Sequence, residues 1–271
     1  MVSPRQALAR LGFGGAPRTY GTGVVTVDLP RDGPVRFARW RHPRETPKTI
    51  DQAVIDHLRT FLAPGDVAID VGAHTGDTAV PLALAVGPEG LVLALEPNPY
   101  VFPCLRQNAS LNPHRARIEA LPWAATREDG PVVFHYSDAG FCNGGRHDGV
   151  AWWRHNHGFA LTVEGRNLQH HLDARPELAG RIRYVKVDAE GHDLAVLETI
   201  TGLIARERPF LRAEVYRHSP ASARRALLAF LRERGYAVHR VAHDAALRGP
   251  RVDDAAAILD GHCDVFAVPA P

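Results

Sequence analysis

The sequence predicts an α/β fold built on a Rossmann-like, nucleotide-binding sheet. Two apolar runs, at residues 67–71 and 91–95, flank a glycine-containing turn and a helical stretch expected at residues 77–86. Short continuous apolar runs are typical of parallel strands that are covered on both faces. The second run stops at Glu96. The sequence therefore predicts a unit of a strand, a tight turn, a helix and a second strand that ends at a carboxylate, as in sheets that bind nucleotides.

The turn between the first run and the helix reads Gly-Ala-His-Thr-Gly over residues 72–76. Gly72 and Gly76 lack a Cβ, which allows a sharp turn and the close approach of a ligand. Glu96, at the tip of the next strand, can accept hydrogen bonds from the two hydroxyl groups of a ribose. Together these features predict an adenosine-containing ligand.

The same turn discriminates between adenosine ligands. A dinucleotide site requires G-x-G-x-x-G, whose second glycine admits the pyrophosphate, and His74 occupies that position here. The Gly-Lys-Ser/Thr signature of a P-loop is also missing. The pattern therefore favours S-adenosylmethionine (SAM) as the cofactor, and an NAD-dependent oxidoreductase is the rival interpretation.

Three segments resemble the FkbM family of SAM-dependent methyltransferases: DVAIDVGAHTGD at residues 66–77, LEPNP at 95–99 and VKVDAEGHD at 185–193. The last, K-x-D-x-E-G-x-D/E, separates that family from other methyltransferases, and the resemblance extends over about residues 50–241. It implies a seven-stranded class I methyltransferase sheet, mostly parallel with its last strand reversed. It also implies O-methylation of a sugar or natural-product hydroxyl, as in antibiotic biosynthesis.

The expected cofactor contacts follow the order of this unit. The glycine turn would hold the methionine half, Glu96 the ribose, and the end of the third strand the adenine. His74 could face the cofactor carboxylate or merely fill the turn, Asn98 could instead cap the next helix, and Trp123 could be a core residue. The predicted contacts are Asp70, Gly72, Ala73, His74, Thr75, Gly76, Glu96, Pro97, Asn98, Trp123, Ala124 and Asp188.

A lysine lies within the fourth expected strand, residues 181–188. Alternation places Ile182, Tyr184, Lys186 and Asp188 on one face of that strand. A buried lysine is costly unless it is paired with an opposite charge. This lysine therefore has either a structural partner or a role in the site.

Glu214, on the expected fifth strand at residues 210–216, is the predicted partner of Lys186. The alternative is functional: Lys186, Asp188, Glu190 and Glu214 would line the carboxyl ends of the strands, where the methyl acceptor binds.

Methyl transfer to a hydroxyl requires an aligned acceptor, a proton acceptor and the exclusion of water. The predicted catalytic residues are Asp188, Glu190 and His192, and the imidazole is favoured as the base by its intrinsic pKa. His192 could instead only flank the helix that starts at Asp193. Mg²⁺ between Asp188 and Glu214 is a second option, but the ligand set is incomplete, so no metal site is predicted.

Residues 137–159 form a long loop that we expect to be a substrate lid. Trp152 and Trp153, with the histidines around them, would make a wall against the acceptor, or would only anchor the loop. The spacing of those histidines matches no common zinc pattern.

Residues 1–48 are expected to form an N-terminal extension and residues 49–271 the methyltransferase domain. The extension contains a predicted hairpin at residues 23–40, which could pair two subunits in a homodimer or cap the substrate side. Further helices are expected at residues 49–62, 100–108, 193–204 and 221–234, and further strands at residues 118–124, 132–136, 160–164, 236–241 and 263–268.

Composition narrows the class of protein. A net charge of +2 over 271 residues gives no bias toward nucleic acid or membrane, and no apolar run reaches transmembrane length. Cys104, Cys142 and Cys263 are far apart, which predicts free thiols in the cytoplasm. Lys48 and Lys186 are the only lysines.

N-methylation of an amino sugar and SAM binding without catalysis are the alternatives to O-methylation of a small acceptor.

Overall fold

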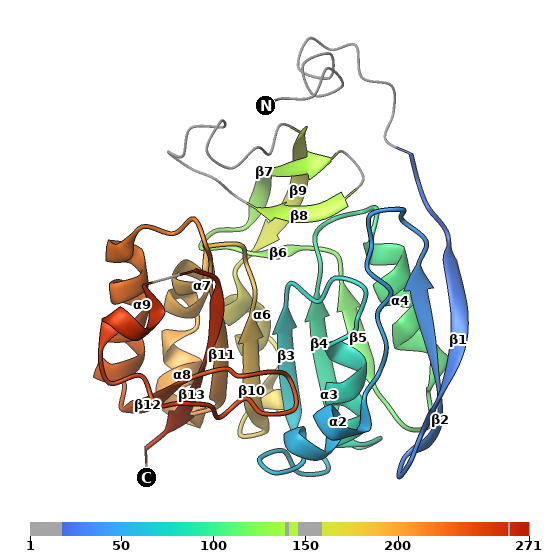
Figure 1. Ribbon diagram of the computed structural model, residues 1–271, viewed down its shortest axis with the longest axis horizontal. Coiled ribbons are helices and arrows are strands. Elements are labelled where there is room, and N and C mark those ends of the chain that lie inside the picture. The colour runs from blue at the N-terminus through green and yellow to red at the C-terminus, as the bar shows by residue number, and fades with distance from the viewer. Residues whose placement is uncertain (1–17, 139–140, 146–158, 260, 271) are drawn as a thin grey trace.

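A seven-stranded sheet forms the middle layer of the protein (Figure 1). The computed structural model describes residues 18–138, 141–145, 159–259 and 261–270. The strand order is β12-β13-β11-β10-β3-β4-β5; β13 runs antiparallel to both neighbours, and the strands from β11 to β5 pair in parallel. This confirms the predicted sheet with its reversed last strand. The strands are β3 (Val67–Val71), β4 (Leu91–Leu95), β5 (Ile118–Leu121), β10 (Ile182–Val187), β11 (Phe210–Val215), β12 (Tyr236–Arg240) and β13 (Cys263–Pro269).

Helices cover both faces of this sheet. The first layer contains α2 (Gln52–Leu58), α3 (Ala79–Val86) and α4 (Phe102–Leu111). The second layer contains α6 (Leu168–Asp173), α7 (Asp193–Thr199), α8 (Thr201–Glu207) and α9 (Ala221–Glu233), with the 3-10 helices η1 (Pro176–Leu178) and η2 (Ala255–Ile258). Ala68 of β3 packs in one apolar cluster with Leu82 of α3, whereas Ile69 packs in the other with Leu197 of α7. Burial on both faces explains the continuous apolar runs.

A small second sheet lies beyond the carboxyl ends of the central strands (Figure 1). Its order is β6-β9-β7-β8, and the register Val132↔Val163 confirms the predicted pairing of residues 132–136 with 160–164. Two expectations were wrong: the third strand of the central sheet ends at Leu121, before Pro122, and residues 141–145 of the expected loop form a strand. The strands are β6 (Ala124–Ala125), β7 (Gly130–Asp138), β8 (Phe141–Gly145) and β9 (Phe159–Arg166). Trp152 and Trp153 lie outside the described residues.

Several helix boundaries differ from the expected ones. Helix α2 ends at Leu58 rather than at residue 62, because the amides of Thr60 and Phe61 bond three residues back, in tight turns. The expected helix at residues 193–204 is two helices, broken at Ile200, whose amide also bonds three residues back, to the Leu197 carbonyl.

The alternation predicted for the fourth strand also fails at its first residue. The register with β3 shifts between Ile182 and Tyr184, so Ile182 packs in the cluster that contains Val185, opposite Tyr184. The Glu207 carboxylate accepts the Ile182 amide at 2.9 Å and thereby holds the irregular residue.

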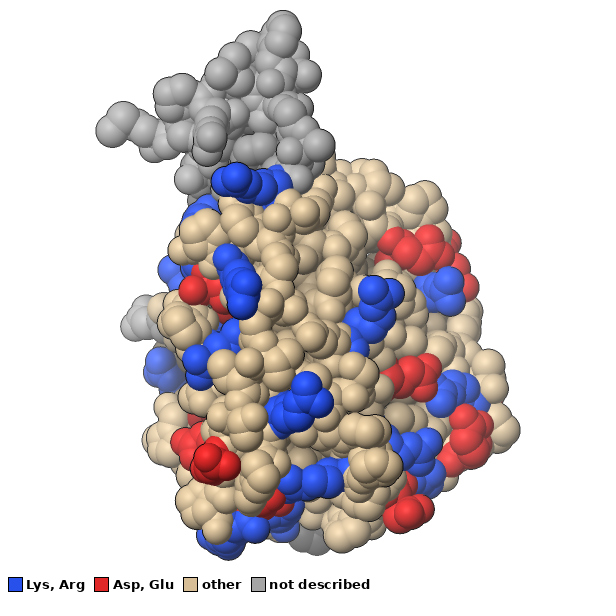
Figure 2. Space-filling model, turned by 90° about the vertical axis from the view of Figure 1, so that its right-hand side faces the viewer, with Lys and Arg blue, Asp and Glu red and all other residues tan. Residues whose placement is uncertain are grey.

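The predicted N-terminal hairpin is present as β1 (Thr22–Leu29) and β2 (Gly33–Trp40), which pair antiparallel. Val35 and Phe37 bury their side chains in the same cluster as α2 and α3. On the face in Figure 2, basic and acidic side chains are interspersed. Pairing of subunits through the hairpin remains a prediction.

Two further sequence expectations concern single features. Cys104 and Cys263 are buried free thiols, as predicted, and the side chain of Cys142 is outside the described ones. Within the described residues, every helix is too short or too polar to cross a bilayer.

Asn108 of α4 joins the hairpin to the glycine turn. Its Oδ1 accepts the Ala38 amide at 2.7 Å, and its Nδ2 donates to the carbonyls of Ala38 at 2.9 Å and Thr75 at 2.7 Å. Asn108 is 2 % exposed, so water cannot replace these bonds.

We expect Asn108→Ala to lower the free energy of unfolding by about 2 to 3 kcal/mol, because it leaves buried backbone groups unpaired. Asn112→Ala is a matched control, since Asn112 makes the same pair of bonds to Arg36 at an exposed position. Urea unfolding should give the control a loss below about 1 kcal/mol. Equal losses of unfolding free energy would show that the buried hydrogen bonds of Asn108 contribute no more to stability than those of Asn112.

Candidate functional site

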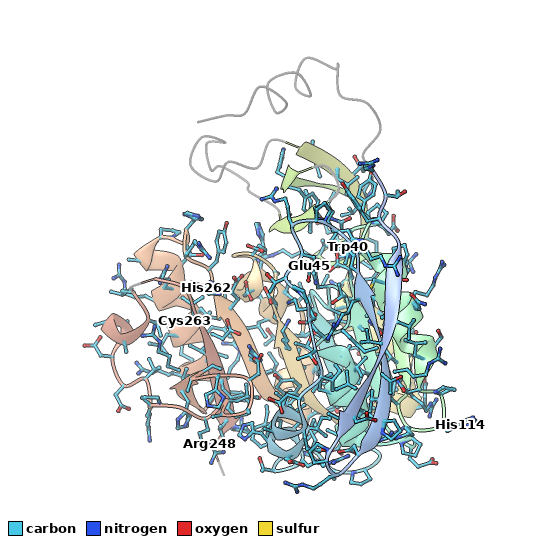
Figure 3. All side chains as sticks on the ribbon, turned by 45° about the vertical axis from the view of Figure 1, so that its right-hand side comes forward. Trp40, Glu45, His114, Arg248, His262 and Cys263 are labelled. Atoms are coloured by element: carbon cyan, nitrogen blue, oxygen red, sulfur yellow. The ribbon has the colours of Figure 1, made fainter. Side chains whose placement is uncertain are left out.

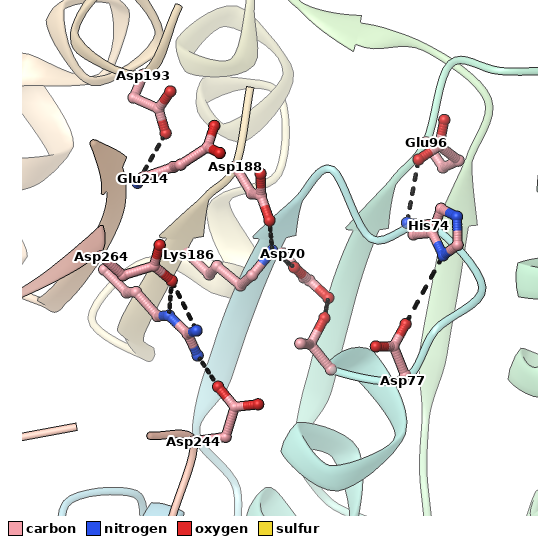
Figure 4. Close-up of polar contacts among 12 residues, drawn as sticks. Asp70, His74, Asp77, Glu96, Lys186, Asp188, Asp193, Glu214, Asp244 and Asp264 are labelled. Carbon is pink, nitrogen blue, oxygen red and sulfur yellow. Dashed lines mark hydrogen bonds and ion pairs between the residues drawn. The ribbon is translucent and has the colours of Figure 1, made fainter. Parts of the chain in front are cut away.

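The main cavity, of about 440 Å³, lies at the carboxyl ends of β3, β4 and β10. The chain runs from β3 toward β5 on one side of the sheet, and β10 and β11 occupy the other side, so the cavity sits where the strand order reverses. Ligands of open α/β sheets bind at this point. Figure 4 shows the polar side chains gathered there.

The glycine turn after β3 is fixed by the neighbouring loop as well as by its own geometry. Gly72 has φ +78° and Gly76 has φ +94°. A Cβ on Gly72 would lie 2.1 Å from the backbone oxygen of Asp188, which follows β10. Glycine is therefore required at position 72 because its backbone lies so close to that of Asp188, whether or not a ligand also binds against the turn.

Glu96 projects from the end of β4 into the cavity. Its two oxygens accept the backbone amides of His74 at 3.0 Å and Asn98 at 2.8 Å. Burial raises the pKa of this carboxyl to about 7. Glu96 is therefore held in one orientation, where its oxygens can still accept from two hydroxyl groups.

A smaller apolar cavity of about 120 Å³ adjoins the main one and shares Gly72, Pro97 and Asp188 with it. Trp123 and Ala124, which were predicted to contact the adenine, line it. Trp123 is also a core residue, 2 % exposed, with its ring 5.2 Å from that of His171.

Asn98 is not brought to either cavity. It is 1 % exposed and absent from the described lining residues of both. Its Oδ1 accepts the Tyr100 amide at 2.9 Å, so it stabilises the turn before α4, whose N-cap is Val101.

Lys186 has partners other than the expected one. Its Nζ lies 3.3 Å from Asp70 Oδ1 and 3.3 Å from Asp188 Oδ2 (Figure 4). The predicted Lys186–Glu214 pair is wrong because the register places Lys186 between Asp70 on β3 and Arg212 on β11. Burial alone would lower the pKa of Lys186, but the carboxylates of Asp188 and Asp70 raise it above its usual value, so the amine stays charged.

Arg212 and Glu214 each have partners on the other side of β11. Arg212 pairs with Asp264 at 2.6 Å and with Asp244 at 2.8 Å. Glu214 Oε1 lies 3.3 Å from Nδ1 of His262. Burial, and then the charge of Asp188, raises the pKa of Glu214 to about 10.

The predicted catalytic residues are divided between the two cavities. Asp188 lines both, Glu190 lines the main one, and His192 lines the smaller one. Glu190 has φ +51°, and burial together with the charge of Asp188 raises its pKa to about 7. Asp193 is structural: its oxygens accept the amides of Glu214 at 3.0 Å and Gly191 at 3.2 Å.

His74 is an uncharged part of the wall. Burial lowers its pKa to about 4. Its Nε2 is 3.7 Å from Glu45 and its Nδ1 is 3.9 Å from Asp77. His74 lines the main cavity, and whether it faces the cofactor carboxylate or only fills the turn stays a prediction.

The N-terminal extension and the small sheet supply lining residues that the sequence did not reveal. These are Arg44, Glu45, Thr46 and Lys48 after β2, with Phe134 and Tyr136 of β7. Of these six residues, only Lys48 stands out in the sequence, because it is one of the two lysines in the chain.

Among the described residues, Asp188 and Glu214 belong to no group of three or more His, Cys, Asp or Glu side chains that could hold a metal ion.

The sequence profile described as the methyltransferase FkbM domain matches residues 70–238. The chain belongs to this family. It therefore carries a SAM-dependent methyltransferase domain, and the fold is that of the class I enzymes.

Other similarities to known proteins are short or of low sequence identity. The chain is 32% identical over 84 residues to a protein-L-isoaspartate O-methyltransferase of Triticum aestivum. The aligned segment is 31% of this chain and 33%, about a third, of that relative. Methyltransferase FkbM of Methylobacillus flagellatus KT has a TM-score of 0.45 at 16% identity, over 75% of this chain and 44% of that one. Aeropyrum pernix fibrillarin, with natively bound SAM, has a TM-score of 0.43 at 13% identity, over 93% and 97%.

We expect Gly72→Ala to destabilise the protein by about 3 kcal/mol or more, because it combines positive φ with the contact to Asp188. Gly180→Ala is the control: Gly180 has φ +75° and nothing within 4 Å of an added Cβ. Its loss should be about 1 kcal/mol in urea unfolding. A Gly72 variant no worse than this control would contradict the close approach.

Proposed function

We propose that this chain transfers a methyl group from SAM to a hydroxyl of a small acceptor, a sugar or a natural product. The observation that carries the proposal is that one cavity has the glycine turn and Glu96 on one wall and Asp188 and Glu190 on another. A donor and an acceptor held in this cavity would meet beside groups that can remove a proton.

The residues present fit the cofactor. The apolar cavity at Trp123 suits the adenine, Glu96 suits the ribose, and the turn at Gly72 leads the methionine half into the main cavity. When bound, SAM supplies an electrophilic methyl group. The task of the chain is to orient the acceptor and to take its proton.

Glu190 is the favoured proton acceptor. Its carboxyl lines the main cavity and has a pKa raised to about 7, near that of an effective general base at neutral pH. The proton that the acceptor hydroxyl loses on methylation would pass to this carboxylate. His192 is the second choice, because it lines the smaller cavity.

The space for the acceptor extends beyond the main cavity. A further cavity of about 430 Å³ shares Lys48, Lys186, Arg212 and Asp244 with it. Each of these cations is paired with a carboxylate. A neutral, hydroxylated acceptor would use their remaining hydrogen-bonding capacity without separating the pairs.

N-methylation of an amino sugar is the second candidate. Asp188 and Glu190 both line the main cavity, where burial and the charge of Asp188 raise the pKa of Glu190, and this pair of acidic side chains would attract an ammonium group. Comparing matched hydroxyl and amino sugars as acceptors distinguishes the two reactions.

The first test is calorimetric titration with S-adenosylhomocysteine (SAH) and with NAD⁺; binding of NAD⁺ alone would overturn the proposal.

We expect SAH affinity to fall, by up to about tenfold per pH unit, as pH drops below about 7, because protonated Glu96 accepts less well from the ribose hydroxyls. Glu96→Gln should bind more weakly and lose this pH response. Glu190→Gln should keep the response, and if it loses the response instead, Glu96 is not the titrating group.

We expect Glu190→Gln to lower turnover about 100-fold or more, with SAH affinity within about threefold of the wild type. Wild-type turnover should fall as pH drops below about 7, since protonated Glu190 cannot accept a proton. Methyl transfer from labelled SAM to acceptors found in a screen of sugars and glycosides measures this. His192→Ala is the comparison, and a larger loss there would make His192 the base.

A further inference from the structure

Both lysines of the chain line the main cavity, although 32 residues are Lys or Arg. Lys186 is 5 % exposed at its side chain and is held between Asp70 and Asp188. Lys48 belongs to the N-terminal extension, before the family match at residues 70–238, and its side chain is 37 % exposed. Its Nζ lies 3.0 Å from Oδ2 of Asp77, just after the glycine turn.

The methionine half of SAM ends in a carboxylate and an ammonium group, so its site needs one cation and one anion. His74 is uncharged near neutral pH. Lys186 and Arg212 are each held by two carboxylates. The other described cations that line the cavity are Arg44, which is exposed, and Lys48, which pairs with Asp77 and also lies within electrostatic range of Glu45.

We infer that the Lys48–Asp77 ion pair receives the zwitterionic end of the cofactor, with Lys48 facing the carboxylate and Asp77 the ammonium group. This inference rests on the proposed function. The pair and the ligand end are each neutral overall, so docking one against the other leaves no buried charge unpaired.

Both partners are held in place by other contacts. Asp77 also accepts the Thr75 hydroxyl at 3.0 Å, within the glycine turn. The Lys48 carbonyl accepts Nε of Arg39, from β2, at 2.8 Å. An ion pair fixed from both sides presents its charges at defined positions, which limits the entropy lost on binding.

The segment between β2 and Lys48 lies against the glycine turn. Trp40, at the end of β2, packs its ring 4.7 Å from that of His42 and 6.1 Å from that of His74. Figure 3 shows Trp40 and Glu45 close together at this end of the hairpin, toward the small sheet. The extension would therefore complete the cofactor site, and Lys48 would be its contact with the ligand.

The test compares two ligands by calorimetry: SAH, and 5′-methylthioadenosine, which keeps the adenine, ribose and sulfur but lacks the amino-acid end. We expect Lys48→Gln to weaken SAH about tenfold or more and to leave methylthioadenosine within about twofold. Lys48→Arg should restore part of the SAH affinity, and Asp77→Asn should behave like Lys48→Gln.

Two further variants serve as controls. Arg31→Gln removes a charge from an exposed pair with Asp56 near the same hairpin and should change neither affinity. Arg44→Gln tests the competing cation of the same segment. A selective loss of SAH binding in Arg44→Gln, but not in Lys48→Gln, would overturn the assignment.

Other outcomes are equally decisive. Unchanged SAH affinity in Lys48→Gln, or equal weakening of both ligands, would mean that Lys48 only supports the fold of the turn. If the wild-type protein binds neither ligand, the proposed function fails, and that result differs from a failure of Lys48 alone.

Discussion

The ion pairs of Lys186 with Asp70 and Asp188 are the interaction on which the site depends. They join the end of β3 to the loop after β10, where Gly72 and Asp188 meet backbone to backbone. Separating buried charges is costly, so the junction resists opening. Because the turn and the acidic loop are fixed to each other here, the two walls of the cavity that they form keep one geometry.

The central sheet was predictable because its signal is local. The runs at β3 and β4 match the structure residue for residue, since burial on both faces requires uninterrupted apolar residues. The break between α7 and α8 and the irregularity at Ile182 were not predictable from the sequence. The first depends on a short local bond at Ile200, and the second on the hydrogen bond that the Ile182 amide donates to the Glu207 carboxylate.

The site was predictable only in part. Glu96, Asp188 and Glu190 follow strand ends, and parallel strands bring their ends together. The partner of Lys186 depends on which residues lie opposite each other on β3 and β11, and no sequence pattern specifies that register. His192 is two residues from Glu190 but lines the other cavity, because Glu190 and Gly191 both have positive φ and turn the chain before α7 begins at Asp193.

The small sheet enters and leaves the domain at one place. Ala124 pairs with Gly165 and Ala125 with Arg166, so the first and last strands of the small sheet lie side by side. Gly165 fits closely there, since a Cβ would lie 2.7 Å from Oγ1 of Thr126. The chain between these anchors can change in length at a small entropic cost. Insertions and deletions between these anchors can therefore accumulate during evolution without disturbing the central sheet or the glycine turn.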